Sequence, residues 1–180
     1  MPDPFISQQD VVDILGRGGT ADAGMLIAVD AACDICRAVA EQEFNAGTAT
    51  CSFDGTNSDV IVLPQRPVTN AGSVFVNGTA ETDFEFTGDG MLFRGTSGVN
   101  PRPVWPAGRQ NVQVTYEYGY TEVPRDVRMV ALSIASRLVL QGPAKRESLG
   151  DQSIDYAVAS TDLTGGEKLI LGKYRRTRSF

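Results

Sequence analysis

The chain has 180 residues, 42% of them hydrophobic, and a formal net charge of −6. This length predicts one domain, or one domain with an insertion, and the hydrophobic fraction suffices for a core. The acidic balance argues against a general nucleic-acid binder, which needs a basic face. No run reaches the roughly 18 apolar residues of a membrane span, and the first residues do not resemble a signal peptide, so we expect a soluble protein made in the cytosol.

The composition also limits the chemistry that the chain can perform. It contains no histidine, which excludes Ser-His-Asp and Cys-His catalysis. Cys33 and Cys36 form a CxxC within a helical pattern, and only Cys51 remains as a further thiol ligand for zinc. We therefore interpret the cysteines as buried apolar side chains and expect no metal, no cofactor and no catalytic residue.

The first 46 residues predict two helices. Ser7 is a suitable N-cap for a short helix over residues 8–15 that ends at Gly16. The glycine-rich segment 16–24 lacks the sequence of a phosphate loop and is interpreted as a joint. A long helix is expected over residues 22–44, because apolar residues recur every three or four positions. Its expected apolar face consists of Leu26, Val29, Cys33, Cys36 and Ala40.

Residues 47–120 predict an antiparallel β region of about six strands, a small sandwich or barrel. Two hairpin turns are expected, at Asp54-Gly55 and at Asn77-Gly78. Residues 121–142 then return to a helical pattern, in which Pro124 suits the first helical position and Gly142-Pro143 the end.

This helix is apolar nearly all round, so we expect it to be covered on more than one face. One stripe consists of Val127, Val130, Ala131, Ile134 and Leu138, and the other side carries Met129, Leu132, Val139 and Leu140. The long N-terminal helix could cover one side, and a neighbouring subunit could cover the other.

The end of the chain differs from the rest in charge. Residues 143–162 have little periodicity beyond a possible strand near 154–158, and are interpreted as a linker or arm. Thr164 and Glu167 form a capping-box sequence that opens a final helix within residues 163–180. The last thirteen residues contain five basic residues and no acid, whereas the 167 before them hold 11 basic and 22 acidic residues. This asymmetry indicates an interaction tail.

Two arrangements are open for the final helix, which is marginally stable alone. Ile170, Leu171 and Tyr174 form an apolar stripe, and basic residues cluster on the other side with Leu169. The helix could pack on its own chain with solvated cations, or it could dock on another protein. The linker and the unbalanced charge favour the second arrangement.

The order of the motifs resembles that of one known family. The motifs are "DVIVLPQRPVTNAGSVFVNG", then "WPAGRQNVQVTYEYGYTEVPRDVRMVALSIASRLVL", and distally "ESLGDQSIDYAV" and "LTGGEKLILGKYRR". They are similar to the head–tail connector (adaptor) family of long-tailed bacteriophages, over most of residues 25–176. Together with the expected elements, the resemblance gives an α+β fold: a helical connector core with an inserted small antiparallel β-sandwich or barrel and a C-terminal docking helix. The chain departs from the smallest members of the family in carrying the β region.

The resemblance also implies a structural role in the virion neck, at the head–tail interface, for a protein made in the host cytoplasm. The family forms a homo-oligomeric ring, for which we expect twelve subunits. The ring lies under the portal protein and above a stopper or tail-completion protein. Genome DNA would pass through the lumen without specific binding, and the acidic body would repel its phosphates. The family's portal-gripping segment maps onto the C-terminus, giving Leu169, Ile170, Leu171, Lys173, Tyr174, Arg175, Arg176 and Phe180 as portal-binding candidates.

Two other function classes fit the residues less well. A β-module for capsid decoration or tail glycan binding could stack sugars on Trp105 and the tyrosines of "TYEYGY", although aromatic residues at strand spacing are more often core. A glycosidase could use a pair of carboxylates. The candidates for that pair are Asp54, Asp59, Asp83, Glu85 and Asp89.

Overall fold

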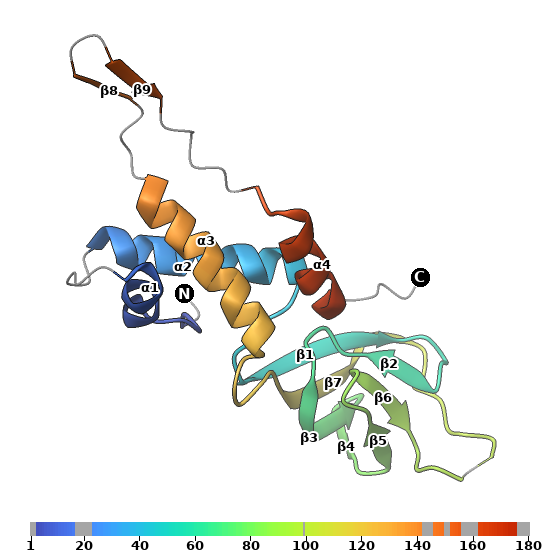
Figure 1. Cartoon of the computed structure of the whole chain (residues 1–180). Helices are drawn as coiled ribbons and strands as arrows, with labels where there is room; N and C mark the ends of the chain where they lie inside the picture. The colour runs from blue at the N-terminus through green and yellow to red at the C-terminus, as the bar shows by residue number, and fades with distance from the viewer. Residues whose placement is uncertain are drawn as a thin grey trace. The chain divides into compact units, whose positions relative to one another are not determined.

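The computed structural model describes residues 3–16, 23–98, 100–141, 146–149, 152–155 and 162–175. The chain forms two compact units, a helical unit (Met1–Glu41 and Val123–Phe180) and a β unit (Gln42–Glu122) (Figure 1). The fold is mixed α+β, as the sequence predicts. None of the helices in the described ranges is long and apolar enough to cross a membrane.

The two N-terminal helices form where the sequence predicts them. Helix α1 (Gln8–Leu15) is capped by Ser7, whose hydroxyl accepts the Asp10 N–H while the Asp10 carboxylate accepts the Ser7 N–H. It ends at Gly16 in the left-handed conformation, with φ of 59°. Helix α2 (Ala23–Ala40) is shorter than expected at its C-terminal end, because Glu41 adopts a positive φ of 55°.

The buried face of α2 differs from the expected one at a single position. Val29, Cys33, Cys36 and Ala40 are buried, as predicted, whereas Leu26 is 47% exposed. Met25 takes its place in the core, since on a helical wheel Met25 lies closer than Leu26 to the direction of Cys36. The side of α2 that faces away from the core therefore begins with two large apolar residues, Leu26 and Ile27.

Helix α3 (Arg125–Gln141) begins one residue later than expected, with the Pro124 carbonyl accepting the Arg128 N–H. Four residues of its predicted core stripe, Val127, Val130, Ala131 and Ile134, are buried, whereas the fifth, Leu138, is half-buried. The helix packs across α2 and also contacts α1 and the final helix α4 (Gly165–Tyr174). Gly142 and Pro143 lie outside the described residues.

A short hairpin precedes α4. Strands β8 (Arg146–Leu149) and β9 (Gln152–Asp155) pair antiparallel, with Arg146 opposite Asp155. The sequence predicted one strand near 154–158 within a linker. The observed pair begins earlier, and Val158 lies outside the described residues.

The β unit contains two antiparallel sheets. The first has the order β1 (Gly47–Gly55), β7 (Gly108–Tyr118), β3 (Val68–Val76) and β4 (Thr79–Glu81). The second has the order β2 (Val60–Val62), β6 (Met91–Arg94) and β5 (Phe84–Phe86). Because β1 and β4 are opposite edges of the first sheet, it does not close, and the barrel alternative is wrong. Both sheets contribute to one core, which contains Ile61, Leu63, Val68, Ala71, Val74, Val76, Leu92, Trp105, Val112, Val114 and Tyr116.

Of the two predicted hairpin turns, one is correct. Asn77 and Gly78 join β3 to β4 with φ angles of 51° and 79°, as a turn matched to strand twist requires. The turn at Asp54-Gly55 is wrong, because β1 continues to Gly55 and pairs with β7, while β2 pairs with β6. The glycine serves a close approach instead: a Cβ on Gly55 would lie 1.8 Å from the Pro106 carbonyl oxygen.

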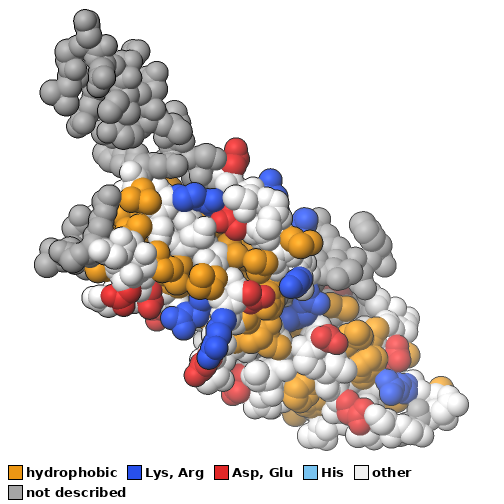
Figure 2. Space-filling view, in the orientation of Figure 1, with side chains coloured by type: hydrophobic (Ala, Val, Ile, Leu, Met, Phe, Trp, Pro, Cys, Tyr) orange, Lys and Arg blue, Asp and Glu red, His pale blue; other side chains and the backbone are white. Residues whose placement is uncertain are grey.

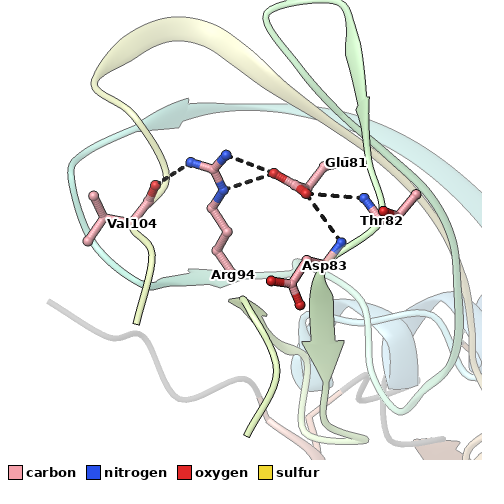
Figure 3. Close-up of polar contacts among 5 residues, drawn as sticks. All are labelled: Glu81, Thr82, Asp83, Arg94 and Val104. Atoms are coloured by element: carbon pink, nitrogen blue, oxygen red, sulfur yellow. Dashed lines mark hydrogen bonds and ion pairs between the residues drawn. The ribbon is translucent and has the colours of Figure 1, made fainter. Parts of the chain in front are cut away.

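An ion pair connects the edge strand β4 of the first sheet to the central strand β6 of the second. Arg94 of β6 donates to Glu81 of β4 from Nε at 3.0 Å and from Nη2 at 2.7 Å (Figure 3). A third guanidinium N–H is donated to the Val104 carbonyl, beside the buried Trp105. Burial alone would raise the pKa of Glu81, but the hydrogen bonds from Arg94 and from the Asp83 and Thr82 backbone hold it below its usual value.

Candidate functional site on helices α3 and α4

Helix α4 carries most of the predicted binding residues, and its start is fixed by a capping box. The Thr164 hydroxyl accepts the Glu167 N–H at 3.3 Å, and the Glu167 carboxylate accepts the Thr164 N–H at 2.8 Å. This confirms the local prediction from T-x-x-E. The cap matters here because α4 contains three glycines, each of which costs up to about 1 kcal/mol in a helix interior.

Glu167 also attaches α4 to α3. Its carboxylate accepts the Ser133 hydroxyl at 2.9 Å and the Arg137 guanidinium at 3.1 Å, and the residue is buried. Burial has the largest effect on its pKa and would raise it. The hydrogen bonds from Thr164, Ser133 and Arg137 outweigh that effect, so the pKa lies below its usual value. The carboxylate is therefore charged at neutral pH, and it accepts three hydrogen bonds from Thr164, Ser133 and Arg137.

The apolar stripe of α4 packs on its own chain. Leu171 is completely buried, and α4 contacts both α2 and α3. The Tyr174 hydroxyl donates to Asp126 at 2.9 Å, and Arg175 pairs with Glu41 at 2.8 Å. This is the intramolecular arrangement that the sequence left as the less favoured of two. The expectation that Leu171 and Tyr174 are held for a groove on another protein is therefore wrong for the chain as it stands.

The opposite side of α4 faces solvent. Leu169 is 72% exposed, the highest value among the exposed large hydrophobic residues described, and Lys173 lies near it on the helical wheel. A Cβ added at Gly165, Gly166 or Gly172 would meet nothing within 4 Å, so the chain's own packing does not require these glycines. Ile170 is half-buried at the boundary between the two sides. Arg176 and Phe180 lie outside the described residues.

The outward side of α3 is also partly apolar. Met129 is 58% exposed and Leu140 is 52% exposed, whereas Val139 is half-buried. Leu132 is buried within the helical unit, so the prediction that it lies at a subunit interface does not fit its position. Figure 2 shows apolar side chains next to Lys and Arg on the face of the molecule where α3 and α4 lie in front.

The sequence analysis missed one exposed apolar feature, the outward side of α2. Ile27 is 69% exposed, and Asp30 and Asp34 follow on the same side at helical spacing. A helical wheel centred on Cys33 and Cys36 would have placed Ile27 opposite the core. The run of apolar residues at 25–29 concealed this, because such a run has no clear periodicity.

Two kinds of chemistry, metal binding and thiol catalysis, find no support in the described residues. No group of three or more Cys, Asp or Glu side chains in the described ranges could hold a metal ion. The thiols of Cys33 and Cys36 are buried, and burial, with the nearby Cys33 and Glu167, raises the pKa of Cys36 to about 12. A thiol with such a pKa is a poor nucleophile at neutral pH.

Four of the residues considered for sugar binding or hydrolysis, Trp105, Tyr116, Glu85 and Asp54, are buried or hydrogen-bonded within the β unit. Trp105 and Tyr116 are completely buried, so neither can stack on a sugar. Hydrogen bonds from the Ser97 hydroxyl and N–H hold the pKa of Glu85 below its usual value, the opposite of what a general acid needs. The Asp54 carboxylate accepts the Gln110 N–H at 2.6 Å and so joins β1 to β7 where their register shifts.

Comparison with known proteins finds similarity in structure alone. No protein-family model and no curated protein matches the sequence. A chain in the neck of an empty GTA particle, computed with C6 symmetry, has a TM-score of 0.66 at 14% identity, covering 98% of this chain and 92% of that one. A chain in the neck of a native GTA particle, computed with C12 symmetry, has a TM-score of 0.64 at 12% identity. That match covers 96% of this chain and 89% of the other. A chain of the native gene transfer agent (GTA) virion has a TM-score of 0.65 at 14% identity. That match covers 100% of this chain and 94% of the other. The chain thus has, over nearly its whole length, the fold of neck chains of a phage-like particle, in agreement with its resemblance to head–tail connectors.

Proposed function

We propose that this chain is a structural protein of a virion neck, a head-to-tail adaptor that forms a ring under the portal. The observation that carries the proposal is the extent of the structural match, which includes both units and leaves little of either chain unmatched. A shared fold alone does not fix a function. Here the fold agrees with motifs that resemble the same class of protein.

The ring extends the DNA channel and presents a platform for the stopper or tail-completion protein. One neighbouring neck was computed with C12 symmetry, and twelve copies are what the resemblance implies for this chain. The 167 residues before Lys168 carry a charge of −11, so the wall of such a channel would repel phosphates and let the genome pass. We expect this role to need no metal, cofactor or catalytic residue.

The portal is gripped by the outward side of α4 together with the basic residues that follow it. Leu169 supplies apolar area, and Lys173 and Arg175 supply charge, with Arg176 and Phe180 continuing the segment. The exposed glycine positions would let a partner's backbone approach α4 closely. Ile170, Leu171 and Tyr174 contribute indirectly, since they fix α4 on its own unit and so orient the gripping side.

A pull-down with the portal of the same particle tests this grip. The variant Leu169→Asp with Lys173→Glu changes only side chains that face solvent, so it should fold normally and lose portal binding. Ile14→Asp is a control for placing an acid at an exposed apolar position, because Ile14 is 49% exposed on α1 and lies off this surface. Retained binding by the α4 variant, or equal loss in the control, would overturn this assignment.

The alternative of a glycan-binding module depends on a different surface. An open hollow on the β unit, lined among others by Phe75, Arg109 and Gln113, is the place where a sugar could contact an exposed aromatic ring. Glycan-array binding that is lost in Phe75→Ala would favour this function over the neck role. We expect no binding.

A further inference from the structure

The outward side of α2 combines apolar and acidic residues. Leu26 and Ile27 are 47% and 69% exposed, and Asp30, Ala31 and Asp34 continue the same side of the helix. Asp34 pairs with Arg37, yet its own side chain remains 54% exposed. We call Leu26, Ile27, Asp30, Ala31 and Asp34 the acidic face. In the described part of the chain, no element covers Ile27.

The outward side of α3 combines apolar and basic residues. Met129 and Leu140 are more than half exposed, and Arg125 and Arg128 are exposed near Met129. Arg128 approaches Asp10 only to 3.7 Å, and its side chain is 44% exposed. We call Arg125, Arg128, Met129 and Leu140 the basic face. The two faces therefore have similar apolar character and opposite charge.

The packing of the helical unit directs these faces away from each other. Helices α2 and α3 pack together through their buried sides, which include Val29 and Cys36 on α2 and Val130 and Ile134 on α3. A residue opposite the buried side of one helix thus points away from the other helix. The acidic and basic faces consequently cannot meet within one chain, but they can meet between two copies.

We infer that the acidic face of one copy docks on the basic face of the next. The inference deepens the proposed ring by assigning its subunit contact, and it rests on that proposed function. A ring requires a heterologous contact, in which two different surfaces of one chain meet head to tail. Two faces of opposite charge on opposite sides of one helical layer satisfy that requirement. Two acidic faces would repel one another, which disfavours a two-fold dimer through α2.

Charge exchange tests the contact with purified full-length chain assembled on the portal. Asp30→Arg with Asp34→Arg should reduce ring occupancy at least about tenfold, because like charges would then face each other. Arg125→Glu with Arg128→Glu should do the same. Combining all four changes should restore assembly, since the charges are again complementary. The control variant, Asp89→Arg with Glu122→Arg, changes the net charge as much as Asp30→Arg with Asp34→Arg does, but at exposed positions of the β unit. It should leave ring occupancy unchanged.

Cross-linking tests the direction of the contact. Ile27→Cys alone and Met129→Cys alone should give no more cross-linked dimer with a bismaleimide than the native chain, whose Cys51 sets the background. A mixture of the two variants should give dimers, and the chain that carries both changes should give a ladder of oligomers. Dimers from either single variant alone, or no ladder from the double variant, would overturn the head-to-tail contact.

The two kinds of failure are separable. If rings form on the portal but the charge exchange shows no rescue and the double cysteine variant gives no ladder, the assigned faces are wrong and the ring stands. If native chain forms no ring with the portal at all, the proposed function itself fails.

Discussion

Replacing Leu171 by alanine measures how firmly α4 is held on its own unit. Leu171 is completely buried, while Leu169, two residues away on the same helix, is 72% exposed. Truncating a buried leucine to alanine typically costs about 2–5 kcal/mol, whereas a change on the exposed side usually stays within about 0.5 kcal/mol. Leu171→Ala and Leu169→Ala remove the same atoms from the same helix, so their difference reports burial alone.

Hydrogen exchange of the α4 amides gives the most direct readout, because loss of Leu171 can release the helix without unfolding the remaining chain. At least about 2 kcal/mol of lost docking corresponds to about thirtyfold faster exchange between Gly165 and Tyr174. Leu169→Ala should change exchange about twofold or less. If the two variants exchange alike, α4 is not held by Leu171 and the intramolecular packing is refuted.

Three further outcomes are expected from individual contacts. The pKa of Glu167 is below its usual value in the folded chain. Its contribution to stability should therefore be complete above about pH 4.5 and lost as the pH falls through the folded-state pKa. In a plot of the unfolding midpoint against pH, Glu167→Gln should flatten that acidic part. Arg94→Met should destabilise the β unit by about 1–3 kcal/mol in urea unfolding, because it leaves the half-buried Glu81 without its partner. A thiol reagent at pH 8 should modify Cys51 in the native chain and leave the two α2 thiols unmodified until denaturant is added, since burial raises the pKa of Cys36 to about 12; rapid native modification of all three would contradict the packing of α2.

Local patterns in the sequence predicted the elements well where side chain and backbone interact within a few residues. The N-cap at Ser7, the capping box at Thr164 and the Asn77-Gly78 turn are such cases, and all three are present. The prediction of a turn at Asp54-Gly55 was wrong, because Gly55 is needed for a close approach to the Pro106 carbonyl instead. That contact joins residues far apart in the sequence, so the local sequence does not reveal it.

The final helix was predicted in the correct segment, but the side that packs on its own chain was not. The sequence identified α4 and its two sides, but charge imbalance favoured docking of the apolar side on another protein. The deciding contacts, Glu167 with Ser133 and Tyr174 with Asp126, join residues more than 30 positions apart, so no local pattern could reveal them. A single helix with an apolar and a basic side fits either arrangement, and only the tertiary packing decides which side is covered.

Mass photometry of the purified chain mixed with its portal tests the neck-adaptor role most directly. We expect the 19.3-kDa chain to add to the portal ring in one discrete step, with an increase in mass equal to twelve copies. If the mass of the portal ring does not change at a saturating concentration of the chain, the neck-adaptor role is contradicted.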